Sequence, residues 1–264
     1  MLAQNTGIQT EQFGPVLKIT LDRPKANAIN TTTSKELATA FIKLRDAPDL
    51  RVGIITGAGT KFFSAGWDLK AAASGESVTA DHGPGGFAGL TELFDLNKPV
   101  IAAVNGLAVG GGFELALACD IIIAVEHAAF FLPEPTLGII PDSGGVLRLP
   151  RALPQHIATE MLLTGRRMSS SEARGWGLVN QVVSEAELSD AAMKTALQIA
   201  ANAPLAVQAI KQINRESQTL TIEQAYKAMR AGTYPAYSQM LTSADAREGI
   251  NAYSAGRPPV WQAR

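Results

Sequence analysis

Short runs of β-branched and aliphatic residues alternate with longer amphipathic stretches through the first half of the chain. Three apolar runs bounded by turn residues predict buried strands at Val52–Thr56, Val100–Val104 and Ile121–Val125. Val16–Leu21 predicts a further strand, and Thr31–Arg45, with its apolar positions on one face, predicts a helix. This alternation of strands and helices indicates an α/β fold.

From about Pro154 the pattern becomes helical. Helical spacing covers four stretches: 184–202, 204–217, 222–232 and 243–254. We therefore divide the chain into a core at residues 1–200 and a C-terminal helical region at residues 201–264. One long connection, Ser74–Gly89, is rich in Gly, Ser and Ala. We expect it to be a mobile surface segment, and long loops of this kind are often functional.

Composition excludes several classes of function. The chain has 264 residues with a net charge of −1, so it has no basic excess to attract nucleic acid or a membrane surface. The single cysteine, Cys119, lies in an apolar run, and we interpret it as a buried small hydrophobe rather than a nucleophile. The three histidines, His82, His127 and His156, lack metal-ligand spacing, so we expect no metal site.

Targeting signals are also missing from the sequence pattern. Residues 1–14 lack the basic-then-apolar order of a signal peptide. No run of about 18 uncharged apolar residues predicts a membrane-spanning helix. The longest candidate, Pro99–Phe113, is interrupted by Asn105 and four glycines. We expect a cytoplasmic protein.

The segment Ile101–Asp120 carries the most informative chemistry. The glycine triplet Gly110–Gly112 is followed two residues later by Glu114, in an otherwise apolar run. Glycines let backbone N–H groups approach a ligand closely, and a helix that begins there has unpaired N–H groups and a dipole that favours negative charge. Glu114 is therefore a candidate acid or base beside an anion-stabilising pocket. The structural alternative is close helix–strand packing with a charge at a helix start.

Two other segments carry similar signals. In Phe62–Lys70, Ala65-Gly66 precedes Trp67-Asp68, so a backbone N–H can face a ligand, unless the segment is only a turn that enters a helix. Glu134 lies between Pro133 and Pro135, which restrict its backbone. Two carboxylates that converge can divide acid and base roles, but spacing alone does not establish that Glu114 and Glu134 converge.

Two short motifs are similar to those of other functional classes, but the residues around them do not fit those classes. Gly57-Ala58-Gly59 follows a strand, but Phe62 replaces the third glycine of a dinucleotide-binding pattern. Asp142-Ser143-Gly144-Gly145 is similar to the nucleophile segment of chymotrypsin-type proteases, which are all-β and usually disulfide-bonded. A helix-rich chain with one cysteine is neither all-β nor disulfide-bonded, so it does not fit the protease class.

Four segments together resemble the enoyl-CoA hydratase/isomerase (crotonase) superfamily: RPKANAIN at 23–30, FFSAGWDL at 62–69, NGLAVGGGFELALACD at 105–120 and PEPTLGIIPDSGG at 133–145. The resemblance covers nearly the whole chain. Three segments that include loop residues are similar to the carnitinyl-CoA dehydratase (crotonobetainyl-CoA hydratase) subfamily: FFSAGWDLKAAA at 62–73, GPGGFAGLTE at 83–92 and PDSGGVLRLP at 141–150.

The resemblance implies a crotonase-like spiral of ββα units that form two nearly perpendicular sheets. It implies C-terminal helices that mediate trimerisation, with trimers often pairing into hexamers. It also implies an acyl-CoA thioester substrate, so that coenzyme A is part of the substrate and no cofactor is tightly bound. The residues that match the CoA groove of the family are Lys25, Ala26, Ala28, Ala65, Asp68, Leu69 and Lys70.

The resemblance assigns the backbone N–H groups of Trp67 and Gly111 to an oxyanion hole for the thioester oxygen as it becomes an enolate. It assigns Glu114 and Glu134 to the pair that adds water across a 2,3-enoyl-CoA. In dehydration, Glu134 would take the α-proton and protonated Glu114 would help the β-hydroxyl leave. We expect carnitinyl-CoA and crotonobetainyl-CoA as the reactants. The alternatives are a general enoyl-CoA hydratase of fatty-acid or amino-acid degradation and a non-catalytic crotonase-like binding module.

Two departures from the family pattern concern the substrate. Asp142 stands where the family usually has glycine. Its carboxylate could favour a trimethylammonium group, with aromatic help from Trp67 or Phe87, or it could cap the helix that follows. Gly256 stands where the family often has a lysine that meets a CoA phosphate, and Arg257 is the candidate replacement.

Overall fold

The structure is a computed structural model that describes residues 7–264. The first six residues of the N-terminal segment considered above lie outside this range. The larger sheet has the strand order β1-β2-β4-β7-β9-β12. Its strands are β1 (Ile8–Phe13), β2 (Val16–Leu21), β4 (Val52–Gly57), β7 (Val100–Val104), β9 (Ile121–Val125) and β12 (Gln181–Val183). Only the β1–β2 pair is antiparallel, and the other neighbours are parallel.

A second sheet has the order β11-β10-β8-β5. Its strands are β11 (Met168–Ser169), β10 (Ala129–Phe131), β8 (Leu107–Val109) and β5 (Phe62–Ser64). The β8 strand is parallel to both β10 and β5. A separate two-residue parallel ladder joins β3 (Ala28–Ile29) to β6 (Gly66–Trp67).

The core helices are α1 (Thr31–Asp46), α2 (Leu69–Ala73), α3 (Gly111–Ala118), α4 (Gly145–Ala152), α5 (Gln155–Thr164), α6 (Ser170–Gly175) and α7 (Leu188–Ala200). Short 3-10 turns form η1 (Phe87–Gly89), η2 (Glu134–Leu137) and η3 (Glu185–Glu187). The α7 helix packs against β2, β4, β7 and β9. All five residues of β7 are buried, as expected for a parallel strand that is covered on both faces.

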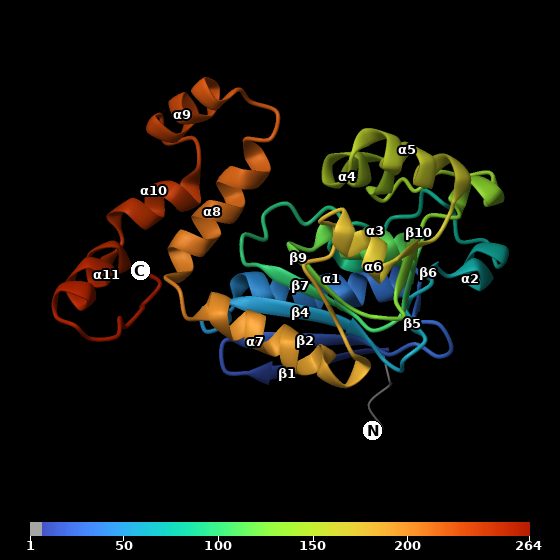
Figure 1. Cartoon of the computed structure of the whole chain (residues 1–264), viewed down its shortest axis with the longest axis horizontal. Coiled ribbons are helices and arrows are strands. Elements are labelled where there is room, and N and C mark those ends of the chain that lie inside the picture. Colours follow the sequence, from blue (N-terminus) through green and yellow to red (C-terminus); the bar gives the residue numbers. More distant parts are fainter. Residues whose placement is uncertain (1–6) are drawn as a thin grey trace.

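The C-terminal helices are α8 (Pro204–Glu216), α9 (Ile222–Arg230), α10 (Pro235–Thr242) and α11 (Ala244–Ser254). They extend away from the sheets (Figure 1). Lys211 on α8 ties this region to the core, because its Nζ lies 2.7 Å from an oxygen of Asp120 and donates to the carbonyl of Lys98 at 3.0 Å. The proposed division at residues 200–201 falls between α7 and α8. Within residues 7–264, no helix combines the length and apolarity needed to cross a membrane.

The strands predicted at 16–21, 52–56, 100–104 and 121–125 are confirmed, as is the helix at 31–45. The helical interpretation of everything after Pro154 is wrong at β11 and β12, which pair with β10 and β9. The α10 helix lies within this helical region but outside the four stretches predicted individually. Strands of two or three residues are too short to carry a recognisable period, so neighbouring strands decide them rather than local sequence.

The segment Ser74–Gly89 is not a surface loop along its whole length. Its first part is mostly exposed, but Phe87, Ala88 and Gly89 are buried. The η1 turn formed by these three residues packs against α1 and α3. The end of this segment is therefore part of the core beside the glycine triplet.

Candidate active site

Two parallel strands bring Glu114 and Glu134 into one region. The β8 and β10 strands pair in register, with Val109 opposite Phe131. The β8 strand leads into Gly110 and α3, and β10 leads into Pro133 and η2. The carboxyl ends of parallel strands meet at the same edge of a sheet. Glu114, in the first turn of α3, and Glu134, the first residue of η2, therefore share that edge.

Gly110 separates these two elements and leaves space for Glu134. Its N–H donates to the carbonyl of Phe131 at 2.9 Å, which attaches the turn before α3 to β10. Gly110 has a φ of 52°, and a Cβ atom there would lie 2.5 Å from Oε1 of Glu134. Only glycine therefore fits between the turn and this carboxyl group.

Both carboxyl groups are buried, and burial is the main cause of their raised pKa values. Glu114 is 3% exposed and Glu134 is 8% exposed. Burial raises the pKa of Glu114 to about 8, although the N–H of Gly145 donates to it, and the charges of Glu134 and Asp142 act in the same direction as burial. Burial raises the pKa of Glu134 to about 7, and the charge of Asp142 adds to this. Groups that titrate near neutral pH are suited to general acid–base catalysis.

One oxygen of this pair has no protein partner. Oε2 of Glu134 is buried and accepts no hydrogen bond from the part of the chain that the structure describes. By contrast, Oε1 of Glu114 accepts a 2.7 Å hydrogen bond from the N–H of Gly145 at the start of α4. Buried polar atoms usually have a partner, so Oε2 of Glu134 is an atom that a reacting molecule can engage.

The backbone segments that carry Trp67 and Gly111 approach each other closely. Asp68 N–H donates to the carbonyl of Ile29 on β3 at 2.9 Å. Successive N–H groups along a strand point to opposite sides, so the N–H of Trp67 points away from β3. Gly111 is the first residue of α3, where N–H groups have no intrahelical partner. Gly66, with a φ of 77°, lets the segment before Trp67 pack closely against the start of α3, since a Cβ atom at Gly66 would lie 2.6 Å from the Gly111 nitrogen.

The β3–β6 ladder pairs the two segments that carry the residues predicted for the CoA groove: Lys25, Ala26, Ala28, Ala65, Asp68, Leu69 and Lys70. Ala65 N–H donates to the carbonyl of Ala26 at 2.9 Å. Asp68 caps α2 and lies 3.3 Å from the guanidinium of Arg23. Leu69 and Lys70 are exposed on the first turn of α2.

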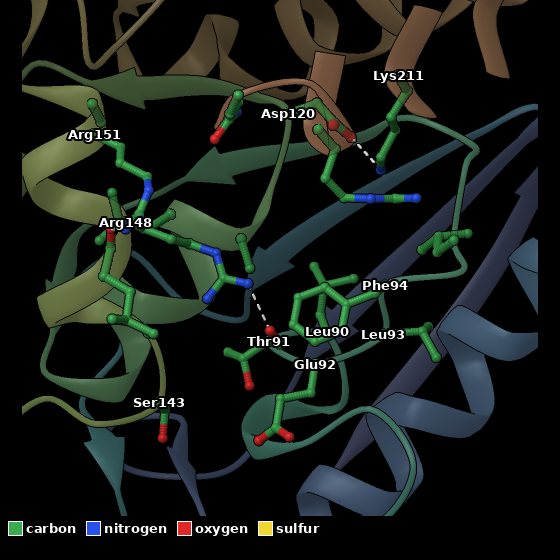
Figure 2. Close-up of a pocket in the computed structure, with 18 of the residues that line it drawn as sticks. Leu90, Thr91, Glu92, Leu93, Phe94, Asp120, Ser143, Arg148, Arg151 and Lys211 are labelled. Atoms are coloured by element: carbon green, nitrogen blue, oxygen red, sulfur yellow. Dashed lines mark hydrogen bonds and ion pairs between the residues drawn. The ribbon is translucent and has the colours of Figure 1, made fainter. Parts of the chain in front are cut away.

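Asp142 does not cap the helix that follows it. The N-cap of α4 is Gly144, and no side chain caps this helix. Together with Ser143, Asp142 instead lines a cavity of about 680 Å³ that also borders α3, α8 and the segment at 90–96. Figure 2 shows Arg148 reaching from α4 to the carbonyl of Thr91, a hydrogen bond of 2.6 Å. Glu114 and Glu134 do not line this cavity.

Sequence reasoning missed three side chains around the site. Arg148 lies in the segment 141–150, and its charge opposes the rise in the pKa of Glu114. Asn27 is buried and bridges the carbonyls of Ala58 and Phe62 at 3.0 Å. Glu76 contacts Trp67. Contacts across 9 to 35 residues leave no local sequence signal.

Cys119 is only half-buried, so the expectation of a fully buried residue is wrong, but its thiol has the surroundings of a structural group. Its Sγ donates to the carbonyl of Leu115 at 3.4 Å. Burial raises the pKa of the Cys119 thiol, which suppresses the thiolate form that a nucleophile requires.

Comparison with known proteins decides the family. The sequence pattern of the family described as Enoyl-CoA hydratase/isomerase matches residues 11–264. The chain belongs to this family. It is 60% identical over 251 residues to a carnitinyl-CoA dehydratase of Salmonella paratyphi A, a match that covers 95% of this chain and 96% of that protein.

Solved structures of this family share the fold. The crystal structure of an enoyl-CoA hydratase from Mycobacterium tuberculosis has a TM-score of 0.90 at 41% identity, and the match covers 98% of this chain and all of that one (100%). The structure of a carnitinyl-CoA hydratase from Mycobacterium avium has a TM-score of 0.77, also at 41% identity, and the match covers 99% of this chain and 100% of that one. The protein is a hydro-lyase with the crotonase fold.

One family feature is altered at the C-terminus. Arg257, the candidate replacement for the family lysine, donates to both carboxylate oxygens of Glu248 at 2.7 and 2.9 Å. Its guanidinium is therefore already paired within this chain, and a CoA phosphate would have to compete with Glu248 for it.

Proposed function

We propose that the protein catalyses the reversible hydration of a 2,3-enoyl-CoA thioester, with Glu114 and Glu134 as the acid–base pair and coenzyme A as part of the substrate. The observation that carries this proposal is the meeting of two buried carboxyl groups, with pKa values of about 8 and 7, beside the first N–H of α3. Membership of the hydratase family supports the same reaction.

In the dehydration direction, ionised Glu134 removes the α-proton of the 3-hydroxyacyl group. The thioester oxygen becomes an enolate oxygen and accepts hydrogen bonds from the N–H groups of Trp67 and Gly111. Protonated Glu114 then donates its proton to the β-hydroxyl, which leaves as water while the carbon–carbon double bond forms. Hydration reverses these steps. Loss of one such donor typically lowers the rate by about 10²–10³-fold.

We propose carnitinyl-CoA and crotonobetainyl-CoA as the reactants. The charge of Asp142 raises the pKa values of both glutamates, so its negative charge acts at the site although Asp142 itself lines the neighbouring cavity. This field favours a trimethylammonium cation over a neutral acyl chain. The 60% identical relative named carnitinyl-CoA dehydratase supports this choice. The Mycobacterium tuberculosis enoyl-CoA hydratase favours the second candidate, a general enoyl-CoA hydratase.

The test compares kcat and KM for crotonobetainyl-CoA and crotonyl-CoA in the wild-type protein and in Glu114→Gln and Glu134→Gln. Each substitution should lower kcat by about 10²-fold or more with little change in KM, because it removes a proton donor or acceptor used in the reaction. Glu126→Gln, at an exposed glutamate on the turn after β9, is the matched control. Undiminished turnover in both active-site variants would contradict the roles assigned to Glu114 and Glu134. A wild-type protein that hydrates neither substrate would instead favour the non-catalytic binding module.

We further propose that the C-terminal region, residues 201–264, associates with other copies of the chain to form a homotrimer, or a hexamer of two trimers. Several apolar side chains there are exposed: Ile210, Ile222, Tyr226, Ile250 and Tyr253. An exposed apolar surface of this kind favours self-association. Light scattering coupled to gel filtration should give a mass of three or six chains, and a monomer would contradict this part of the proposal.

A further inference from the structure

Glu76 connects three parts of the chain through one carboxylate. Its Oε1 accepts a 2.9 Å hydrogen bond from the indole Nε1–H of Trp67. Its Oε2 accepts hydrogen bonds from the N–H and the hydroxyl of Thr31, at 3.1 and 2.9 Å. Because Thr31 is the first residue of the 16-residue helix α1, the carboxylate also lies at the positive end of a helix dipole. Burial acts to raise the pKa of Glu76, but the hydrogen bonds outweigh it and lower the pKa, so this group is ionised at neutral pH.

The segment that begins at Glu76 is attached to α1 a second time. Oγ of Ser34, in the first turn of α1, accepts a 3.1 Å hydrogen bond from Ala88 N–H. The same Oγ lies 3.0 Å from Nδ1 of His82. The His82 ring packs edge-on against the Phe87 ring, with centroids 5.2 Å apart. Residues 76–88 are thus held against the first turn of α1 at both ends.

This segment also contacts both proposed oxyanion donors. At its start, Glu76 binds the side chain of Trp67. Near its end, the ring of Phe87 lies directly over the Cα of Gly111, where a Cβ atom would overlap the ring. The β6 strand that carries Trp67 has only two residues, so few backbone hydrogen bonds orient its N–H. The indole–carboxylate hydrogen bond is a further contact that restrains Trp67.

We propose that Glu76 is a positioning residue. By holding the indole of Trp67 it directs the backbone N–H of the same residue into the oxyanion hole, and the segment 76–88 braces both donors from the first turn of α1. This inference rests on the proposed function, because it assigns Glu76 a role in the hydration of the enoyl-CoA.

A double-mutant cycle tests the proposal. Glu76→Ala and Trp67→Phe each remove the indole–carboxylate hydrogen bond and leave the Trp67 backbone N–H in place, and Glu76→Ala also removes the two hydrogen bonds from Thr31. Each should lower kcat by roughly tenfold with KM changed by less than about threefold, because the donor is misdirected only where charge develops in the transition state. The double variant should lose no more than Glu76→Ala alone, because the indole–carboxylate hydrogen bond that Trp67→Phe removes is already absent there. Glu76→Gln, which keeps an acceptor oxygen, should retain more activity and serves if Glu76→Ala does not fold.

Glu187→Gln is the matched control. Glu187 also accepts hydrogen bonds from a helix-start residue, Ser184, through the N–H at 3.1 Å and the hydroxyl at 2.6 Å. It lies in η3, outside the site. Its substitution should leave kcat unchanged even if the melting temperature falls. An unchanged kcat in Glu76→Ala, additive losses in the double variant, or an equal loss in Glu187→Gln would overturn the positioning role.

A spectrum separates this inference from the proposed function. With 15N-tryptophan, the chain has three indole N–H resonances, from Trp67, Trp176 and Trp261. Trp67→Phe identifies the first of them, and Glu76→Ala should shift that resonance alone. An unshifted Trp67 resonance would rule out the Glu76–Trp67 hydrogen bond, regardless of the hydratase activity of the variant. If the wild-type protein hydrates no enoyl-CoA but Glu76→Ala still shifts the Trp67 resonance, the proposed function is wrong and the Glu76–Trp67 hydrogen bond stands.

Discussion

The main-chain N–H of Gly145 donates a 2.7 Å hydrogen bond to Oε1 of Glu114, from the first residue of α4. A helix start and a hydrogen bond both favour the ionised carboxylate. Burial nevertheless dominates and raises the pKa of Glu114 to about 8. Gly145 therefore orients this carboxyl group without forcing it to give up its proton at neutral pH.

The proposed reaction should have a bell-shaped pH–rate profile. Catalysis in either direction requires one proton on the pair, and the pKa values of Glu134 and Glu114 are about 7 and 8. The two groups interact, so these values describe the pair together. We expect kcat/KM for crotonyl-CoA to be highest between pH about 7 and 8 and to fall on both sides. A rate that is constant across that range and for two pH units on either side would contradict the acid–base assignment.

Stability should also change with pH at these two residues. A carboxyl group whose folded pKa is raised stabilises the protein at low pH, and this contribution is lost as the pH rises through the folded pKa. Glu114→Gln keeps an acceptor for Gly145 but cannot ionise. Its melting temperature relative to the wild type should therefore rise with pH and level off above about 8, whereas the gain for Glu134→Gln should level off above about 7. Calorimetry at several pH values measures both, and a gain that shrinks with rising pH would contradict the prediction.

The close approach of Gly66 to Gly111 can be tested with a matched pair of glycines. Gly66 and Gly59 have φ values of 77° and 78°, so alanine is strained at both by about 1–2 kcal/mol. An added Cβ atom meets nothing within 4 Å at Gly59 but lies 2.6 Å from the Gly111 nitrogen at Gly66. Gly66→Ala should separate the two oxyanion donors and lower kcat by about 10²-fold, whereas Gly59→Ala should lower stability alone. Equal kcat values in the two variants would rule out the proposed donor arrangement.

Asp142 should determine the preference for a cationic acyl group. In Asp142→Asn, kcat/KM for crotonobetainyl-CoA should fall by about tenfold relative to crotonyl-CoA, because a nearby negative charge is lost. The charge of Asp142 raises the pKa values of Glu114 and Glu134, so both limbs of the pH profile should also move to lower pH. Asp190→Asn, at an exposed position in the first turn of α7, is the control. Unchanged selectivity would exclude Asp142 from substrate recognition.

Local pattern alone determined the main supports of the fold. The strands β2, β4, β7 and β9 and the helix α1 follow from hydrophobic periodicity and turn residues, which act over a few neighbouring positions. The glycine triplet before Glu114 marked the start of a helix because glycine is the residue that suits that backbone. The same sequence signals identified Trp67 and Glu134 as positions of interest.

Tertiary structure decided how these parts meet. The parallel pairing of β8 with β10 brings Glu114 and Glu134 to one sheet edge, and burial there moves their pKa values toward neutrality. Tertiary structure also decided the role of Asp142, for which the sequence allowed either a helix cap or a contact with the substrate. It decided the contacts of Glu76 as well, for which the sequence contained no signal. These outcomes depend on contacts between residues far apart in the chain and on the exclusion of water around them. Neither factor can be recognised from the residues that are neighbours in the sequence.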